Sequence, residues 1–332
     1  MSVYIVPQSR VPDLLPMREC IDLMANVLRT LARGDAVLPL RSLLRTPDGN
    51  GLLGLMPAML GEPPCMGIKV ISVYFNNEAA GLDSHQGAVL LFEPEHGSLV
   101  AMIDASSITA IRTAAVSGAA TRALAREDAG DLAMIGAGVQ AITHLEAMLC
   151  VRKLRRVRVW SLHADKVRAF AERESKRHGI RVETMGSARE AVEGADMVCT
   201  TTGAKEPVVN GDWLAPGAHI NAVGACFPNT RELDTKAVVR SRLVVDRRES
   251  ALNEAGDFLI PRKEGAIGDD HIVGELGDVL LGKVPGRRSP DEITLFKSLG
   301  IAVEDLAAAH LIWSKARAGG EPAIDFGGHR IG

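Results

Sequence analysis

The chain has few aromatic residues and almost no net charge. Only 4% of its 332 residues are aromatic, and 38 Lys and Arg stand against 41 Asp and Glu, a formal net charge of −3. Proteins that bind nucleic acid or anionic membranes through charge carry clustered excess Lys and Arg. The near-zero net charge therefore predicts neither a nucleic-acid partner nor an anionic membrane. The length allows two domains, or one large α/β domain, with a substantial buried core.

Long apolar runs, paired cysteines and repeats are missing as well. No apolar run approaches the roughly 20 residues that cross a bilayer, and residues 1–10 lack the basic and apolar segments of a signal peptide. The cysteines are odd in number and form no C-x-x-C pair, which predicts neither a disulfide framework nor a metal site. They are Cys20, Cys65, Cys150, Cys199 and Cys226. We therefore expect a cytoplasmic protein without a metal.

The middle of the chain alternates short aliphatic segments with helical ones. Predicted strands lie at 131–135, 157–160, 180–183, 196–199, 219–223 and 243–246. Predicted helices lie at 139–149, 165–178 and 188–193. This alternation, with 33 glycines in the chain, is typical of an α/β fold with a doubly wound parallel sheet.

The first part of the chain has a different pattern. Strand-like segments at 70–75, 88–92 and 99–103, separated by turn residues, predict an antiparallel sheet. Helices are predicted at 17–32 and 301–318, and the second should pack on the first domain. The predicted boundaries near Ser117 and Gly300 give one domain of residues 1–117 with 301–332 and another of residues 118–300.

A glycine turn follows the strand at 131–135. In Gly136-x-Gly138-x-x-Ala141, the first glycine allows a tight turn, the second lets a pyrophosphate approach the backbone, and Ala141 allows close helix packing. A small-residue turn of purely structural role is the alternative. Within a strand–helix alternation the motif predicts a dinucleotide site.

The residues after the next strand bear on the choice of cofactor. An NAD site usually carries Asp or Glu at this strand end, but the strand at 157–160 is followed by Ser161 and His163. With Arg168 nearby, these side chains could receive a 2′-phosphate, which favours NADPH, with NADH possible. Alternatively, they only begin a solvated helix, with Asp165 as its cap.

Three cations lie in apolar surroundings: Arg41, Lys69 and Arg112. A buried cation must be paired, and a substrate carboxylate is one possible partner. Arg offers a bidentate fork for a carboxylate, and a desolvated Lys suits proton transfer near neutrality. Each cation could instead pair with a protein carboxylate. The three together favour a pocket for an anionic substrate.

Other candidates are weaker. His85 and Gln86 can be a simple turn before a strand, and His144, inside a helix, is expected to be structural. We find no Ser/His/Asp arrangement, metal triad or P-loop in the sequence.

Ordered motifs along nearly the whole chain resemble the ornithine cyclodeaminase/μ-crystallin family. They are Leu55-Met-Pro-Ala58, Gly67-Ile-Lys-Val70, His85-Gln-Gly-Ala-Val-Leu-Leu-Phe-Glu93, Ile108-Thr-Ala-Ile-Arg-Thr-Ala-Ala115, Ile135-Gly-Ala-Gly-Val-Gln140, Pro216-Gly-Ala-His-Ile-Asn-Ala-Val-Gly-Ala225, Arg231-Glu-Leu-Asp234 and Phe296-Lys-Ser-Leu-Gly300.

The resemblance implies a homodimer whose first domain binds substrate and supplies the dimer interface through its sheet, and whose second is a Rossmann domain for NAD(P). It implies that Arg41, Lys69 and Arg112 are the substrate-carboxylate and catalytic residues. It also implies a set of cofactor contacts: Thr113, Gly136, Ala137, Gly138, Val139, Gln140, Ser161, Thr201, Val223, Ser298 and Leu299.

One departure from the family pattern concerns the reaction. Cyclodeaminases carry an Asp shortly after the segment that matches Asn221–Gly224, and this chain has Cys226 there. A thiol replaces neither the charge nor the acceptors of a carboxylate. The pattern is more similar to the ketimine reductases and amino-acid dehydrogenases. Cys226 is then expected to form a wall of the substrate pocket.

These observations predict an NAD(P)H-dependent reductase of cyclic imino acids. Its substrates would be Δ1-pyrroline-2-carboxylate or Δ1-piperideine-2-carboxylate, and its products proline or pipecolate. Lys69 would protonate the imine, while Arg41 and Arg112 would hold the carboxylate. An L-alanine-type amino-acid dehydrogenase, an ornithine cyclodeaminase and a non-catalytic NADPH-dependent binder of small ligands are the alternatives.

Overall fold

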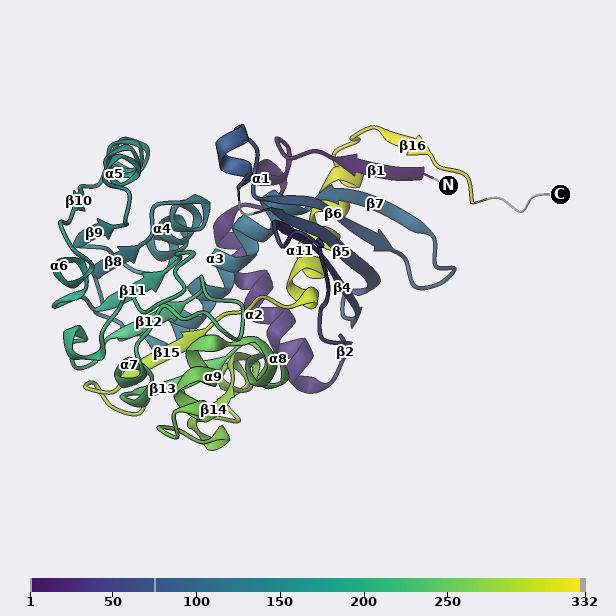
Figure 1. Ribbon diagram of the computed structural model, residues 1–332. Helices are drawn as coiled ribbons and strands as arrows, with labels where there is room; N and C mark the ends of the chain where they lie inside the picture. Colours follow the sequence, from purple (N-terminus) through teal and green to yellow (C-terminus); the bar gives the residue numbers. More distant parts are fainter. Residues whose placement is uncertain (1, 75, 329–332) are drawn as a thin grey trace. The chain divides into compact units, whose positions relative to one another are not determined.

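A computed structural model describes residues 2–74 and 76–328 (Figure 1). The chain divides into two compact units. The first unit comprises residues 1–112 with 300–332, and the second unit comprises residues 113–299. Helix α3 (Ala105–Leu124) carries the chain from the first unit into the second.

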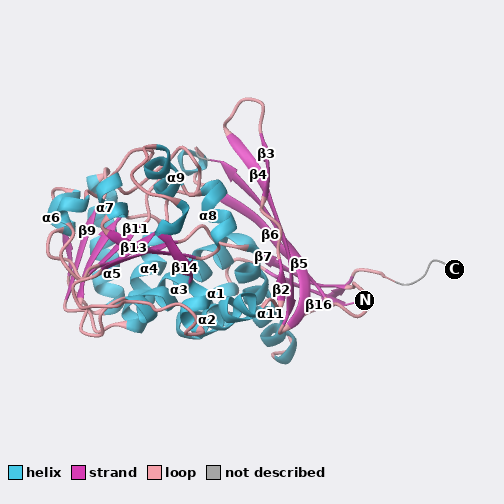
Figure 2. Cartoon of the chain, turned by 90° about the horizontal axis from the view of Figure 1, so that it is seen from below, coloured by secondary structure: helices cyan, strands magenta, loops and turns pink. Residues whose placement is uncertain are grey.

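The first unit is built on an eight-stranded sheet in the order β16-β1-β7-β6-β5-β4-β2, with β3 paired to β4. Its strands are drawn in magenta in Figure 2. The strands β4 to β7 form an antiparallel meander, which confirms the antiparallel sheet expected from the sequence. The strands are β1 (Ser2–Val6), β2 (Ala36–Val37), β3 (Ser42–Arg45), β4 (Gly51–Gly61), β5 (Pro64–Tyr74), β6 (His85–Phe92), β7 (Leu99–Asp104) and β16 (Ala323–Asp325).

Strand β4 was not predicted because both of its faces are apolar. Leu52, Met56 and Leu60 are buried, while Leu53 and Met59 between them are exposed. The sequence therefore lacks the alternation of apolar and polar residues that marks a half-buried strand.

Two helices cover one face of this sheet. Helix α2 (Met17–Arg33) buries Ile21, Met24 and Leu28 at helical spacing. Helix α11 (Ala302–Ala318) packs against α2 and against strands β4 and β5, as predicted. Gly67 of β5 allows this approach, because a Cβ there would lie 2.7 Å from a methyl group of Leu306. The short helices α1 (Val11–Leu14) and η1 (Asn77–Ala80) complete the unit.

The second unit is a parallel sheet of eight strands in the order β10-β9-β8-β11-β12-β15-β13-β14, which confirms the predicted doubly wound α/β fold. The six strands expected there lie within a few residues of their predicted bounds. The strands are β8 (Asp131–Ile135), β9 (Arg156–Trp160), β10 (Val182–Thr184), β11 (Met197–Thr200), β12 (His219–Ala222), β13 (Ser241–Val245), β14 (Ile272–Glu275) and β15 (Ile293–Lys297).

Strands β14 and β15 are absent from the prediction, although β15 lies between β12 and β13. The helices of this unit are α4 (Val139–Val151), α5 (Ala164–His178), α6 (Ala188–Val192), α7 (Thr235–Val239), α8 (Arg248–Glu254), α9 (Gly256–Lys263), α10 (Leu276–Leu280), η2 (Gly211–Trp213) and η3 (Asp269–His271). Among the described residues, no helix is both long and apolar enough to cross a bilayer.

Candidate active site

The glycine turn has the geometry of a dinucleotide-binding turn. Gly136 follows β8 with φ +121°, and a Cβ there would lie 2.6 Å from Thr201 Oγ1 and 2.9 Å from the Thr201 carbonyl oxygen. Gly138 caps the N-terminus of α4, where a Cβ would meet no atom within 4 Å. The turn thus needs Gly136 for its backbone, whereas Gly138 leaves open space at the positive end of a helix dipole.

The carboxyl ends of neighbouring parallel strands carry the other expected cofactor contacts. Ser161 follows β9, Thr201 follows β11, Val223 follows β12 and Ser298 follows β15. The crevice at this edge of an open α/β sheet, where the strand order reverses, is where ligands bind. In this sheet β9 lies on one side of β8 and β11 on the other.

Ser298 and Leu299 are buried at this edge. The Leu299 amide donates to Asp246 Oδ2 at 2.6 Å. The Ser298 hydroxyl has no hydrogen-bond partner among the described residues. A buried hydroxyl without a hydrogen-bond partner destabilises a protein core. Such a group is expected where a bound ligand supplies the partner. This edge therefore fits a dinucleotide, and the individual contacts stay predictions.

The residues expected at the 2′-phosphate lie at the start of α5. His163 is its N-cap residue and Arg168 lies further along the helix, and both side chains are exposed. The alternative role given to Asp165 is wrong, because Asp165 lies inside the first turn and does not cap the helix. The preference for NADPH stays a prediction.

The three cations of the first unit do not share one environment. Lys69 on β5 and Arg112 on α3 are each only 3% exposed. Arg41, directly before β3, is half-buried and donates from Nη2 to the Gly300 carbonyl oxygen at 2.8 Å. Gly300 has φ +72°, and a Cβ there would clash with the Arg112 guanidinium. The Gly300 carbonyl oxygen thus binds Arg41, and the absence of a side chain at Gly300 leaves room for Arg112.

Two carboxylates that the sequence analysis missed pair with the buried cations. Asp305 Oδ2 lies 2.7 Å from Lys69 Nζ, and Asp305 Oδ1 accepts from Arg112 Nε at 2.8 Å. Glu304 Oε2 accepts from Arg112 Nη1 at 2.6 Å. The pairing with protein carboxylates, which was the alternative, is therefore present for Lys69 and Arg112. Two adjacent acids inside an apolar helix, Val303-Glu-Asp-Leu306, were the signal that could have revealed it.

The cluster joins cations and acids from distant parts of the chain. Lys69 and Arg112 pair with Asp305, Arg112 also pairs with Glu304, and Arg41 is bonded to Gly300 beside them. Glu304 and Asp305 lie in the first turn of α11, where the helix dipole stabilises negative charge.

Burial shapes the acid–base behaviour of Lys69. Desolvation lowers its pKa to about 8, although the attraction of Asp305 opposes the effect, and Arg112 and Arg41 lower it further. Burial alone would raise the pKa of Asp305, but Arg112 and Lys69 outweigh it and keep that pKa below its ordinary value. Lys69 can therefore exchange a proton near neutral pH, while Asp305 stays ionised.

Cys226 lies in the second unit, in the loop after β12. Its thiol is half-buried and donates to the Val223 carbonyl oxygen at 3.3 Å. Its expected role as a wall of the substrate pocket stays a prediction.

A buried acidic pair behind this loop was also missed. Glu232 accepts hydrogen bonds from Thr200 Oγ1 at 2.8 Å, the Thr202 amide at 2.7 Å and the Gly224 amide at 2.6 Å. Asp257 Oδ2 lies 2.9 Å from Lys297 Nζ. These contacts fix the loops after β11 and β12, the same loops that carry Thr201 and Val223.

His144 is structural, as expected. Its ring lies within hydrogen-bond distance of Ser117 Oγ at 3.0 Å and of the Gln140 carbonyl oxygen at 2.7 Å. Burial lowers its pKa to about 4, so it is neutral at physiological pH. His85 is the first residue of β6 rather than a turn before it.

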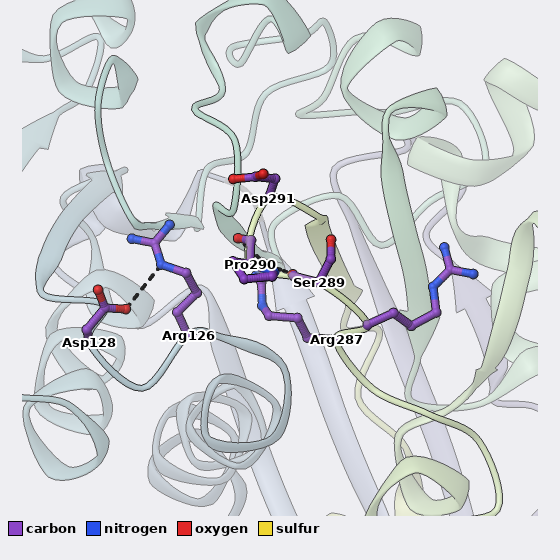
Figure 3. A pocket seen from close by; sticks show the side chains of 7 residues that line it. Arg126, Asp128, Arg287, Ser289, Pro290 and Asp291 are labelled. Atoms are coloured by element: carbon purple, nitrogen blue, oxygen red, sulfur yellow. Dashed lines mark hydrogen bonds and ion pairs between the residues drawn. The ribbon is translucent and has the colours of Figure 1, made fainter.

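A cavity of about 620 Å³ in the second unit is lined mainly by charged residues (Figure 3). Arg126 bonds Asp196, beside the start of β11, and Arg287 bonds the Ala218 carbonyl oxygen, beside the start of β12. The cavity thus lies at the amino ends of the strands, the edge opposite the glycine turn. Ligands of open α/β sheets bind at the other, carboxyl edge. The arginines of this cavity bond carbonyl and carboxylate oxygens of the surrounding loops, and we assign it a structural role.

Known proteins resemble this chain over nearly its whole length. Ketimine reductase mu-crystallin from Mus musculus is 41% identical over 286 residues, covering 86% of this chain and 87% of that protein. The structure of Thermococcus litoralis Δ1-pyrroline-2-carboxylate reductase in complex with NADH and L-proline matches with a TM-score of 0.94 and 41% identity, covering 96% and 98% of the two chains.

A third match is an archaeal alanine dehydrogenase dimer with bound NAD. Its TM-score is 0.93 and its identity 31%, over 98% of this chain and 100% of that one. The family model for ornithine cyclodeaminase and mu-crystallin matches residues 3–320. The motifs, the fold and these matches agree, and the chain belongs to the ornithine cyclodeaminase/mu-crystallin family.

Proposed function

We propose that this chain is an NAD(P)H-dependent reductase of cyclic imino acids, which converts Δ1-pyrroline-2-carboxylate or Δ1-piperideine-2-carboxylate to proline or pipecolate. The observation that carries the proposal is the buried cluster of Lys69 and Arg112, whose lysine has a pKa of about 8. Similarity to a reductase bound to NADH and L-proline supports it.

The first unit would bind the substrate. Arg41 and Arg112 would hold the substrate carboxylate through their guanidinium groups. Among the described residues, the Lys69 ammonium contacts Asp305 and Thr109, with Thr109 Oγ1 at 3.5 Å. Since an ammonium has three hydrogens, one remains for the imine nitrogen. Lys69 would donate this proton and make the C=N carbon electrophilic.

The second unit would bind the cofactor at the carboxyl edge of its sheet. Gly136, Gly138 and the N-terminus of α4 would hold the pyrophosphate, and Ser298 would donate its unpartnered hydroxyl to the bound group. When bound, the reduced nicotinamide would supply the hydride for the imine carbon. Lys69 would supply the proton for the nitrogen, and hydride and proton together account for the reduction of C=N to CH–NH.

The test is the oxidation of NADPH and NADH by the purified protein, followed in absorbance, with each of the two cyclic imines. We expect turnover with at least one of them and its loss in Lys69→Met. Cofactor that is not consumed with either imine, together with a Lys69→Met variant that behaves like the wild type, contradicts the proposal.

An L-alanine-type dehydrogenase is the second candidate, because the similarity to an archaeal alanine dehydrogenase extends over the whole chain. It would use the same cations but would need ammonia as a co-substrate. Cofactor oxidation by pyruvate with ammonia, and none by cyclic imines, would establish this activity instead. Ammonia release from ornithine without net NADH formation would identify a cyclodeaminase.

We also propose that the chain forms a homodimer through the open face of the first sheet. Apolar side chains such as Ile5, Leu53 and Met59 are 49%, 36% and 46% exposed there, and large exposed apolar patches mark interaction sites. Light scattering in solution tests this, and Met59→Asp should shift the mass toward that of one chain. The five free cysteines favour the cytoplasm as its compartment.

A further inference from the structure

We propose that Asp305 is a positioning residue of this site, whose carboxylate holds the Lys69 ammonium and the Arg112 guanidinium in one fixed geometry and keeps Lys69 protonated for the reaction. The inference rests on the proposed function and extends it to a residue on the last helix of the chain, far in sequence from both cations.

The geometry singles out Asp305 among the charged groups of the cluster. Its Oδ2 lies 2.7 Å from Lys69 Nζ and its Oδ1 accepts from Arg112 Nε at 2.8 Å, so each oxygen serves a different cation. Glu304 is equally buried, but its Oε2 bonds Arg112 Nη1 at 2.6 Å and the Ile301 amide at 3.3 Å. Asp305 is thus the carboxylate that joins the two cations.

The two acids therefore have separable tasks. Glu304 fixes Arg112 to the N-terminus of α11, while Asp305 sets the environment of Lys69. Asp305 from α11, Arg112 from α3 and Arg41 from the segment before β3 shift the pKa of Lys69. Lys69 in turn lowers the pKa of His85 on β6, and Glu304 of α11 is paired with Arg112. Of these, Asp305 is the carboxylate in direct contact with the ammonium.

Loss of this carboxylate should favour neutral Lys69. Burial disfavours the charged ammonium, and Asp305 opposes that effect. In Asp305→Asn, Lys69 keeps its burial and the repulsion of two arginines but loses its negative neighbour, so it should release its proton at lower pH. Glu304→Gln is the matched control, because it removes an equally buried negative charge that does not touch Lys69.

The experiment measures the protonation of Lys69 without turnover. Competitive acylation with acetic anhydride between pH 6 and pH 10, quantified by mass spectrometry of the Lys69 peptide, gives the midpoint at which the amine becomes reactive. We expect a wild-type midpoint near 8. It should fall by about one pH unit or more in Asp305→Asn, change little in Glu304→Gln, and be restored largely by Asp305→Glu.

The pH dependence of kcat/KM should shift in the same variants and in the same order as the acylation midpoint. In Asp305→Asn, kcat/KM for the imine should decline at lower pH than in the wild type, so that the deficit is smaller at pH 6 than at pH 8. A merely structural role would lower activity equally at all pH values. Saturating NADH, which stabilises the folded state by mass action, keeps the measurement possible if the variant is less stable, and Asp305→Glu provides a second variant that retains the charge.

A midpoint in Asp305→Asn equal to that of the wild type, or one shifted no further than in Glu304→Gln, overturns the inference. The acylation needs no substrate. A wild-type protein that reduces no imine but shows the shift would refute the proposed function and leave the role of Asp305 intact.

Discussion

One cluster of cations and acids in each unit invites comparison, and their different chemistry follows from burial. In the first unit, Arg112 and Lys69 share Asp305 with almost no exposure to solvent. In the second unit, Arg126 and Arg287 line an open cavity and bond carbonyl and carboxylate oxygens at the amino ends of the strands.

The comparison shows how burial changes the acid–base behaviour of charged side chains. The side chain of Arg126 is 25% exposed. Burial alone would lower its pKa, but Asp128 and Asp196 outweigh burial and raise it, so Arg126 stays charged at every ordinary pH and cannot exchange a proton. In the buried cluster the same kinds of side chain are poorly solvated, so each depends on its neighbours and the lysine pKa is lowered to about 8. The number of arginines does not distinguish a candidate active site from a structural cluster, whereas their burial does.

The largest expected effect is that of Lys69→Met. Loss of the proton donor should reduce kcat/KM for the imine by about 10²- to 10⁴-fold, because the methionine fills similar space without a titratable group. Steady-state NADPH oxidation measures this, and the Kd for NADPH should not change. Activity within a few-fold of the wild type would show that the buried cluster has no catalytic advantage over the open one.

The same substitution in each cluster compares them directly. Arg112→Met leaves Glu304 and Asp305 buried beside an apolar side chain, which should cost about 3–5 kcal/mol of stability and raise KM for the imine about 10- to 100-fold. Arg126→Met should cost about 1 kcal/mol or less and leave KM unchanged. Thermal unfolding measures the loss of stability and steady-state kinetics measure KM. Equal losses of stability in the two variants would show that burial does not distinguish the two clusters.

The pH dependence of activity is the third test. Lys69 acts as a proton donor, so the active form lies below its pKa of about 8. We expect kcat/KM to fall about tenfold per pH unit above that value. Lys69→Met should lack this decline, while Arg126→Met should retain it. A decline that persists in Lys69→Met would assign it to another group.

The two glycines of the dinucleotide turn should respond differently. In Gly138→Ala the new methyl group meets no neighbour within 4 Å, so the free energy of unfolding should change by less than about 1 kcal/mol. The Kd for NADPH should rise about tenfold, because the methyl group occupies space that the ligand needs. Gly136→Ala, at φ +121° and against Thr201, should lose about 1–3 kcal/mol of stability. Fluorescence titration and thermal unfolding distinguish these outcomes.

The smallest effect is expected at the exposed cations of α5. Arg168→Ala should raise the Kd for NADPH about fivefold, as expected for the loss of one charge-assisted hydrogen bond in solvent, and leave the Kd for NADH unchanged. Arg173→Ala on the same helix is the control, since Arg173 pairs with Glu174. An equal loss for both cofactors would show that Arg168 does not select the 2′-phosphate.

Much of the second unit could be predicted because its signals are local. A strand, a glycine turn and a helix follow one another within residues 131–151, and each is encoded by its own residues. Strand β15 was missed although it is central, since its short segment Ile293–Lys297 carries no periodicity that separates it from a buried loop.

The candidate site of the first unit could be predicted only in part. Lys69 and Arg112 were recognised because a charge in an apolar segment is unusual. Their partners Glu304 and Asp305 were not, because these residues follow Arg112 by 192 and 193 positions, and no local pattern connects them.

The sequence alone thus determined the fold class of the second unit, three antiparallel strands of the first, the glycine turn and the identity of the cations, because hydrophobic periodicity and turn chemistry act over a few neighbouring residues. Only the tertiary structure decided which charges meet. The packing of α11 against β5 brings Asp305 to Lys69 and to Arg112. At a site this deeply buried, that contact controls the proton on Lys69, because the energy of a buried charge depends on its nearest neighbours in space and not on its neighbours in sequence.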